Sequence, residues 1–191
     1  MLVRTIIATV MLAFSLAGAP VAATLDFTEV SSGYQRGTVL ELSNATVTSL
    51  GSDLYVYRAN QSSTIGPLGG FCAIGGGCAA DALIDFKGGP VAALQFTTHG
   101  WQSGDRADIS IFAGNSVLST MTIMANTLVD FTGFSGITSM LIDDTSTAAG
   151  MAYTNFSFTS ASTPTAVPLP MAGWLLFAAV GGLVWVKRRR T

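Results

Sequence analysis

The sequence predicts an all-β protein, built as a single antiparallel β-sandwich with one apolar segment at each end of the chain. Three observations predict this architecture. Apolar and polar residues alternate with a period of two through residues 24–160, Gly- and Ser-containing turns separate these runs, and the longest apolar stretches, 5–19 and 171–186, are terminal. Only 10% of the 191 residues are charged, where a soluble domain carries about 25%. The two ends are therefore membrane-directed, and the middle is the globular domain.

Residues 1–23 predict a secretory signal peptide. Arg4 supplies the positive charge and Thr5–Leu16 forms the apolar core. Val21-Ala22-Ala23 provides the small residues that a signal peptidase requires, so we expect cleavage after Ala23. Ala17-Gly18-Ala19 also fits the small-x-small rule, but a cut there would leave a proline first. A permanent N-terminal membrane helix is the alternative, and the shortness of the apolar stretch disfavours it.

Residues 24–160 predict nine to eleven short strands at intervals of about 12 residues, an interval typical of a sandwich. No part of this stretch sustains an amphipathic helical pattern for three turns. About 135 residues suffice for one hydrophobic core and are too few for two. The alternating sets are Leu25, Phe27 and Glu29; Leu54 and Val56; Ala82, Ile84 and Phe86; Ala92, Leu94 and Phe96; Ile109 and Ile111; Val117, Ser119, Met121 and Ile123; Ile137, Ser139 and Leu141; and Ala152, Thr154, Phe156 and Phe158.

Cys72 and Cys78 are the only cysteines and predict a disulfide. Export places them in an oxidising compartment, and the three glycines between them permit the tight reversal that the bond requires. Closing so short a loop contributes roughly 2 kcal/mol to stability. A zinc site is disfavoured because the chain holds one histidine, and a redox-active pair would more often be spaced C-x-x-C.

His99 and Trp101 are the candidate functional residues of the middle domain. A histidine with Asp105 and Asp108 downstream could suggest acyl transfer, but the G-x-S-x-G turn that presents a nucleophilic serine is absent from the sequence. We therefore predict a loop histidine and no catalytic residue. The functional alternative makes His99 and Trp101 glycan contacts, since an indole face stacks on the apolar face of a pyranose.

The acidic residues allow a calcium site as an alternative, but we predict solvated carboxylates, no bound metal and no cofactor. Carboxylates crowded in a loop favour a hard cation. The EF-hand spacing is absent, however, and the adjacent Asp143 and Asp144 would point to opposite faces of a strand. The other candidate pairs are Asp81 with Asp85 and Asp105 with Asp108.

The charge of the middle domain excludes one class of partner. Residues 24–163 hold four basic residues and all eleven acidic ones, a net charge of −7. Such a domain repels phosphate backbones, so we expect no nucleic-acid binding. The basic residues of this stretch are Arg36, Arg58, Lys87 and Arg106.

The C-terminal segment predicts a linker at 161–166 and a single membrane helix. Met171–Val186 contains 16 residues without a charge. A helix of 16 to 18 residues is about 24 to 27 Å long, marginal for a hydrocarbon core of roughly 30 Å. A basic stop-transfer cluster closes the helix, and the positive-inside rule keeps it cytoplasmic and places residues 24–165 outside. The cluster is Lys187, Arg188, Arg189 and Arg190.

The motif Val167-Pro168-Leu169-Pro170 precedes this helix. Two prolines one residue apart hold an extended backbone, which is accessible to a processing enzyme. VPLPMAGWLLFAAVGGLVWVKRRR closely resembles the VPLPA-type C-terminal sorting domain, a variant of the PEP-CTERM class, over about 24 of the 191 residues. The resemblance implies that an exosortase recognises Val167, Pro168, Leu169 and Pro170. Met171 departs from the alanine that is usual there, and a plain single-pass anchor is the alternative.

The closing stretch FSGITSMLIDDTSTAAGMAYTNFSF loosely resembles the last hairpin of the lectin-like β-sandwiches that often precede such anchors. This resemblance favours a jelly roll over an immunoglobulin-like arrangement. The expected function is that of a non-enzymatic exported protein, anchored in the inner membrane until an exosortase releases it to the cell surface or the extracellular matrix. The alternatives are a membrane-anchored module that binds, or less readily cleaves, exopolysaccharide, and an unprocessed tethered domain.

Overall fold

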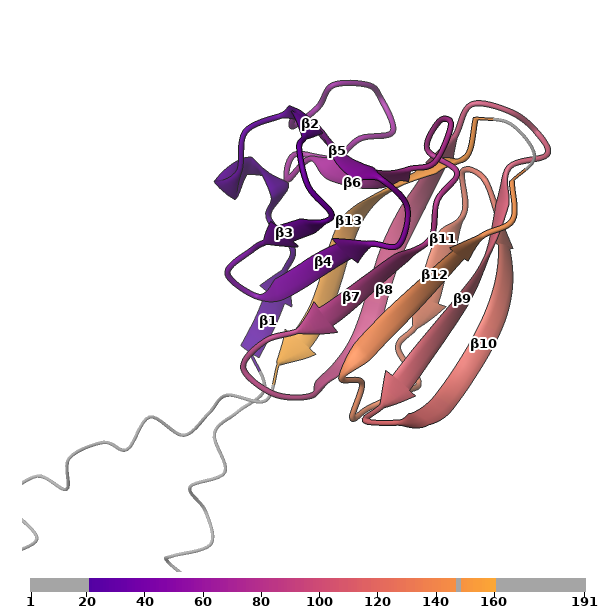
Figure 1. Cartoon of the computed structure of the whole chain (residues 1–191). Coiled ribbons are helices and arrows are strands. Elements are labelled where there is room, and N and C mark those ends of the chain that lie inside the picture. Colours follow the sequence, from indigo (N-terminus) through magenta and orange to yellow (C-terminus); the bar gives the residue numbers. More distant parts are fainter. Residues whose placement is uncertain (1–20, 147–148, 161–191) are drawn as a thin grey trace, which may run out of the picture. The chain divides into compact units, whose positions relative to one another are not determined.

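Two antiparallel sheets pack face to face in the computed structural model, which describes residues 21–146 and 149–160 (Figure 1). The prediction of an all-β sandwich is confirmed. The strands are β1 (Val21–Thr24), β2 (Gly33–Gln35), β3 (Val39–Glu41), β4 (Ala45–Ser49), β5 (Asp53–Tyr57), β6 (Gly70–Ile74), β7 (Ala82–Phe86), β8 (Val91–Gly100), β9 (Arg106–Ala113), β10 (Ser116–Met124), β11 (Leu128–Phe131), β12 (Ser139–Asp144) and β13 (Met151–Ser160).

The described residues hold 13 strands where the alternating pattern predicts nine to eleven. The difference lies in strands such as β2 and β3, of three residues each, and β1 and β11, of four. Strands this short contain too few residues to display a period of two. They pair because longer neighbours offer them unpaired backbone groups.

The strands divide between a seven-stranded and a six-stranded sheet. The first has the order β11-β8-β13-β6-β5-β2, with β1 also paired to β13, and the second has the order β10-β9-β12-β7-β4-β3. All pairs between these strands are antiparallel. From β7 to β13 the chain crosses between the sheets at almost every connection, so residues distant in sequence meet in the core.

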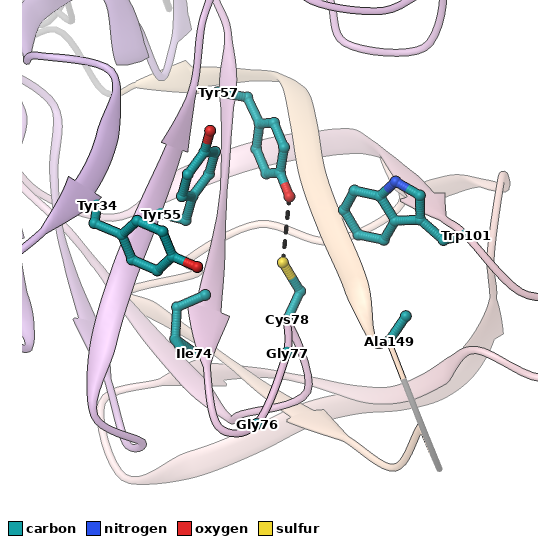
Figure 2. Close-up of a pocket in the computed structure, with 9 residues that line it drawn as sticks. All are labelled: Tyr34, Tyr55, Tyr57, Ile74, Gly76, Gly77, Cys78, Trp101 and Ala149. Atoms are coloured by element: carbon teal, nitrogen blue, oxygen red, sulfur yellow. Dashed lines mark hydrogen bonds between the residues drawn. The ribbon is translucent and has the colours of Figure 1, made fainter.

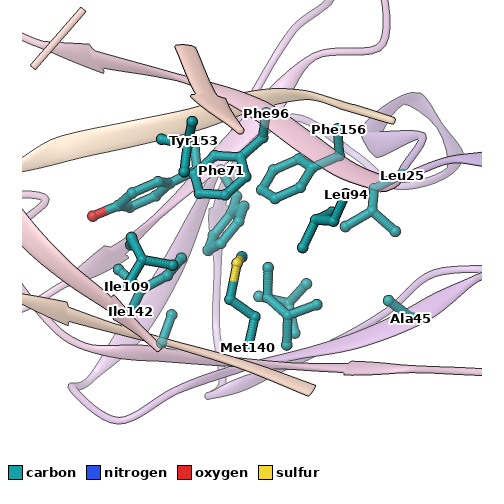
Figure 3. Close-up of a cluster of buried hydrophobic side chains, with 14 of the residues drawn as sticks. Leu25, Ala45, Phe71, Leu94, Phe96, Ile109, Met140, Ile142, Tyr153 and Phe156 are labelled. Atoms are coloured by element: carbon teal, nitrogen blue, oxygen red, sulfur yellow. The ribbon is translucent and has the colours of Figure 1, made fainter. Parts of the chain in front are cut away.

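The core between the sheets is rich in aromatic rings (Figure 3). Phe71 is fully buried and its ring lies 5.4 Å from that of Phe27 and 5.6 Å from that of Tyr153, measured between centroids. Phe96 stacks on Phe156 at 4.9 Å. Full burial of one such side chain contributes about 1.5 to 3 kcal/mol. The turn before β2 adds Phe27 to this cluster through the short 3-10 helix η1 (Phe27–Glu29), which the Asp26 side chain caps.

β13 changes the face that it presents to the core at Asn155. This residue has a φ of 56°, and the pairing with β8 shifts register between Thr154 and Ser157. The predicted single alternation of Ala152, Thr154, Phe156 and Phe158 therefore does not hold across Asn155. Phe156 and Phe158 lie in the main core, whereas Ala152 belongs to a small cluster on the outer face of the sheet.

Several predicted segments lie outside the described residues. These are the signal peptide up to residue 20, the linker 161–166, and the sorting motif, helix and basic tail of 167–191. Ala23 lies in β1 and pairs with Phe158, so the predicted cleavage would remove three of the four residues of that strand. Within 21–146 and 149–160, no helix is long and apolar enough to cross a membrane.

Candidate functional site

Aromatic side chains line a pocket of about 510 Å³ on the outer face of the seven-stranded sheet (Figure 2). We call it the aromatic pocket. Its walls carry rings, glycine backbone and small apolar groups, and none of its lining residues is charged. The lining residues are Tyr34, Tyr55, Tyr57, Ile74, Gly76, Gly77, Cys78, Trp101 and Ala149.

The alternation of β5 places two of these rings. Leu54 and Val56 point into the core, so Tyr55 and Tyr57 stand on the outer face. Tyr34 of β2 lies directly opposite Tyr55 across the strand pair. The result is a row of four rings: centroid distances are 5.1 Å from Tyr34 to Tyr55, 4.8 Å from Tyr55 to Tyr57 and 5.9 Å from Tyr57 to Trp101.

The predicted disulfide between Cys72 and Cys78 is confirmed and forms one wall of the aromatic pocket. The reversal between the two cysteines uses Gly76 and Gly77 at φ values of 88° and 151°, which side chains with a Cβ rarely adopt. The Tyr57 hydroxyl donates a hydrogen bond to Cys78 Sγ at 3.2 Å. Burial raises the pKa of Tyr57, and the neighbouring tyrosines add to this, so its hydroxyl stays protonated at neutral pH.

The loop that carries Cys78 is also held from β13. Cys78 N donates to Ala149 O at 2.8 Å, and Met151 N donates to Cys78 O at 3.2 Å. Gly150 makes this approach possible, because a Cβ at that position would lie 2.1 Å from the Cys78 carbonyl oxygen. The pocket wall therefore has backbone hydrogen bonds in addition to the disulfide.

His99 and Trp101 lie together, as their proximity in sequence suggests, but only Trp101 lines the aromatic pocket. The His99 ring packs edge-on against the indole at 5.1 Å, and its Nδ1 lies 2.7 Å from Thr64 Oγ1 and 3.2 Å from Asn126 Oδ1. His99 thus supports the indole from beside it. The buried Asp105 holds the turn that carries Trp101. Its Oδ2 accepts hydrogen bonds from the backbone N–H groups of Trp101 and Gln102.

A second pocket, of about 310 Å³, adjoins the first and shares Tyr55 with it. Arg58 is the only charged residue of its lining. The Arg58 guanidinium donates from Nε to Ser32 Oγ at 2.9 Å, and the Arg58 backbone N–H donates to Gln61 Oε1 at 2.9 Å. We call this the Arg58 pocket. Its lining residues are Ser32, Gly33, Tyr55, Arg58 and Gln61.

Asp143 and Asp144 point to opposite faces of β12, as predicted. Asp143 is exposed, whereas Asp144 is buried. Asp144 Oδ1 accepts from the backbone N–H of Ser146 at 2.9 Å, and Oδ2 accepts from Met151 N at 3.3 Å and from the Tyr153 hydroxyl at 3.2 Å. Burial raises the pKa of Asp144, and these hydrogen bonds act in the opposite direction. Its role is therefore to satisfy polar groups in the interior.

The other acidic pairs of the sequence do not assemble into a metal site. Asp81 Oδ1 accepts from the backbone N–H of Asp144 at 3.0 Å, and Asp108 Oδ1 accepts from the Thr122 hydroxyl at 2.5 Å. In the part of the chain that the structure describes, no group of three or more His, Cys, Asp or Glu side chains could hold a metal ion.

Neither protein-family models nor curated proteins give a match to this chain.

The arrangement is suited to binding through ring faces and hydroxyl groups. The aromatic pocket brings three tyrosines and a tryptophan together without a carboxylate or histidine in its lining. Sequence reasoning found Trp101 and missed Tyr34, Tyr55 and Tyr57. A signal was present at Tyr55 and Tyr57, since two aromatic residues on the polar side of an alternating strand indicate an exposed aromatic surface.

Proposed function

We propose that the chain is a non-enzymatic exported protein of the cell surface or extracellular matrix, sorted by an exosortase-type system. The observation that carries this proposal is the coincidence of an N-terminal stretch with the pattern of a signal peptide, the VPLP motif, an apolar segment and a basic tail. The disulfide supports it, since such bonds persist in oxidising compartments. The finer fold that we propose for the sandwich is a lectin-like jelly roll.

The sorting proposal is tested by the mass of the mature C-terminus. The protein is recovered from strains with and without the exosortase, and its C-terminal peptide is mapped by mass spectrometry. We expect a tail shortened near 167–170 only when the enzyme is present. The double variant Pro168→Ala/Pro170→Ala should block this shortening, while Pro164→Ala, a proline of the preceding linker, should not. An identical C-terminus in both strains would overturn the proposal.

The second candidate function, glycan binding by the sandwich, is favoured by the row of four rings in the aromatic pocket. Aromatic faces pack against the apolar C–H faces of pyranoses, while tyrosine hydroxyls and the indole N–H can hydrogen-bond sugar hydroxyls. A volume of about 510 Å³ is of the size that small ligands occupy. The aromatic pocket has no carboxylate in its lining, so the geometry favours binding over cleavage.

Glycan binding is tested with Trp101→Ala against a matched control. Trp101 is 48% exposed, so the variant should fold. We expect oligosaccharide affinity, measured by calorimetry, to fall at least tenfold, because aromatic anchors dominate such contacts. Phe112→Ala is the control, since Phe112 lines a separate surface pocket on the six-stranded sheet. Equal affinities for the wild type and both variants would remove the aromatic pocket as the binding site.

A further inference from the structure

The outer face around Tyr55 differs in charge from the rest of the domain. None of the eleven acidic residues lines the aromatic pocket or the Arg58 pocket, although the middle domain carries a net charge of −7. One of its four basic residues, Arg58, lies there. By contrast Lys87, which directly follows β7 of the other sheet, forms an ion pair with Glu41 at 2.5 Å. The face thus presents a cation to a pocket without an acidic lining, although the domain as a whole is acidic.

The Arg58 guanidinium has hydrogen-bonding capacity to spare. Only Nε is engaged, by Ser32 Oγ, and the residue is exposed. Within the described residues its two terminal nitrogens make no hydrogen bond, and no carboxylate lies within ion-pair distance of them. Gln61 uses Oε1 to accept from the Arg58 backbone, which leaves its amide Nε2 as a further donor in the same pocket.

Tyr55 joins the two pockets, because it is a lining residue of both. A ligand stacked on the rings of Tyr57 and Trp101 therefore reaches the guanidinium by extending past Tyr55. We propose that the site takes an acidic glycan: a sugar face stacks in the aromatic pocket, and an anionic substituent of the same chain pairs with Arg58. This proposal rests on glycan binding as the function of the site and names the class of glycan.

The charge of Arg58 decides which glycans bind, although the net charge of the domain is negative. A planar guanidinium matches a carboxylate or sulfate through two parallel hydrogen bonds, which are short and strong. The acidic residues elsewhere on the domain act through solvent, where salt screens charges beyond about 8 Å at physiological ionic strength. A neutral glycan would stack on the rings, but the guanidinium of Arg58 would still lack an anionic partner.

The experiment compares a neutral glycan with its carboxylated form and with a sulfated glycan. The full-length protein in detergent is titrated with polygalacturonate oligosaccharides, with the same oligosaccharides after reduction of their carboxyl groups, and with sulfated galactan oligosaccharides. We expect at least tenfold tighter binding of the acidic forms. Arg58→Gln should abolish this preference, while Arg106→Gln, which removes an exposed cation of the six-stranded sheet, should keep it.

The outcomes separate this inference from the function on which it rests. Preference for carboxylated or for sulfated oligosaccharides that is lost in Arg58→Gln supports the inference and identifies the substituent. Equal binding of charged and reduced forms, sensitive to Trp101→Ala and not to Arg58→Gln, overturns the acidic selection and leaves glycan binding in place. Binding of none of the three overturns both.

Discussion

The seven-stranded sheet carries an aromatic cluster on each face, and the two clusters differ in their exposure to solvent. On the inner face, Phe71, Phe96 and Phe156 are buried against the second sheet. On the outer face, Tyr34 and Trp101 are 71% and 48% exposed. The inner rings are stabilised by exclusion of water, whereas the outer rings remain available to a ligand. The same strands therefore provide the stability of the fold on one side and the candidate binding surface on the other.

The two clusters also use tyrosine hydroxyls differently. The Tyr153 hydroxyl is buried in the core and donates to Asp144, while the Tyr57 hydroxyl donates to the disulfide at the edge of the aromatic pocket. Burial is the first cause that raises the pKa of both groups, and the charge of Asp144 adds to it at Tyr153. The hydrogen bond of its own hydroxyl thus fixes the Tyr153 ring in the interior and the Tyr57 ring at the aromatic pocket.

The largest expected effect is that of Phe71→Ala. Removing a fully buried phenyl ring from the inner cluster should lower the free energy of unfolding by about 3 to 5 kcal/mol, because the neighbouring rings cannot fill the cavity. Tyr34→Ala, from the outer cluster, should lower it by about 0.5 kcal/mol or less. Both are measured by chemical denaturation followed by circular dichroism. Similar losses in the two variants would contradict the division of roles between the clusters.

Much of what could be predicted about the fold came from the alternation of residues along the strands. It grouped Leu54 with Val56, which are both buried in the structure, and placed Asp143 and Asp144 on opposite faces. The aromatic pocket was not predictable to the same extent, because it depends on which strands pair. Tyr34 reaches Tyr55 only through the register of β2 on β5.

Single residues with unusual backbone geometry limited the prediction as well. Asn155, with a positive φ, moves Ala152 to the outer face beneath the pocket and keeps Phe156 in the core. Gly150 allows Ala149 to approach Cys78. A period of two in the sequence contains no record of such local changes of direction, so the packing beneath the pocket and one of its walls could not be derived from it.

Loss of the disulfide should have an intermediate effect on the free energy of unfolding and should also affect ligand binding at the aromatic pocket. Reduction of the wild type should lower the free energy of unfolding by about 2 kcal/mol, the value expected for so short a loop. It should also weaken glycan binding, since Cys78 is part of the pocket wall and accepts from Tyr57. The variant Cys72→Ala/Cys78→Ser, measured with and without reductant, is the control for side effects of the reductant. Unchanged stability on reduction would show that the backbone bonds of Cys78 alone hold the wall.

The smallest expected effect is a dependence of stability on pH that originates at Asp144 beneath the inner cluster. Burial raises the pKa of this carboxyl above 3.8, so the unfolded chain releases the proton at lower pH than the folded protein does. Between the two pKa values the folded state holds more protons, and its stability therefore falls as the pH rises through this window. Asp144→Asn should remove that part of the pH dependence, and Asp143→Asn, at the exposed neighbour, is the matched control for the loss of one carboxylate. Denaturation curves at several pH values below and above 3.8 give the comparison. A wild type that gains stability relative to Asp144→Asn as the pH rises would mean that the three hydrogen bonds to the carboxylate outweigh its burial.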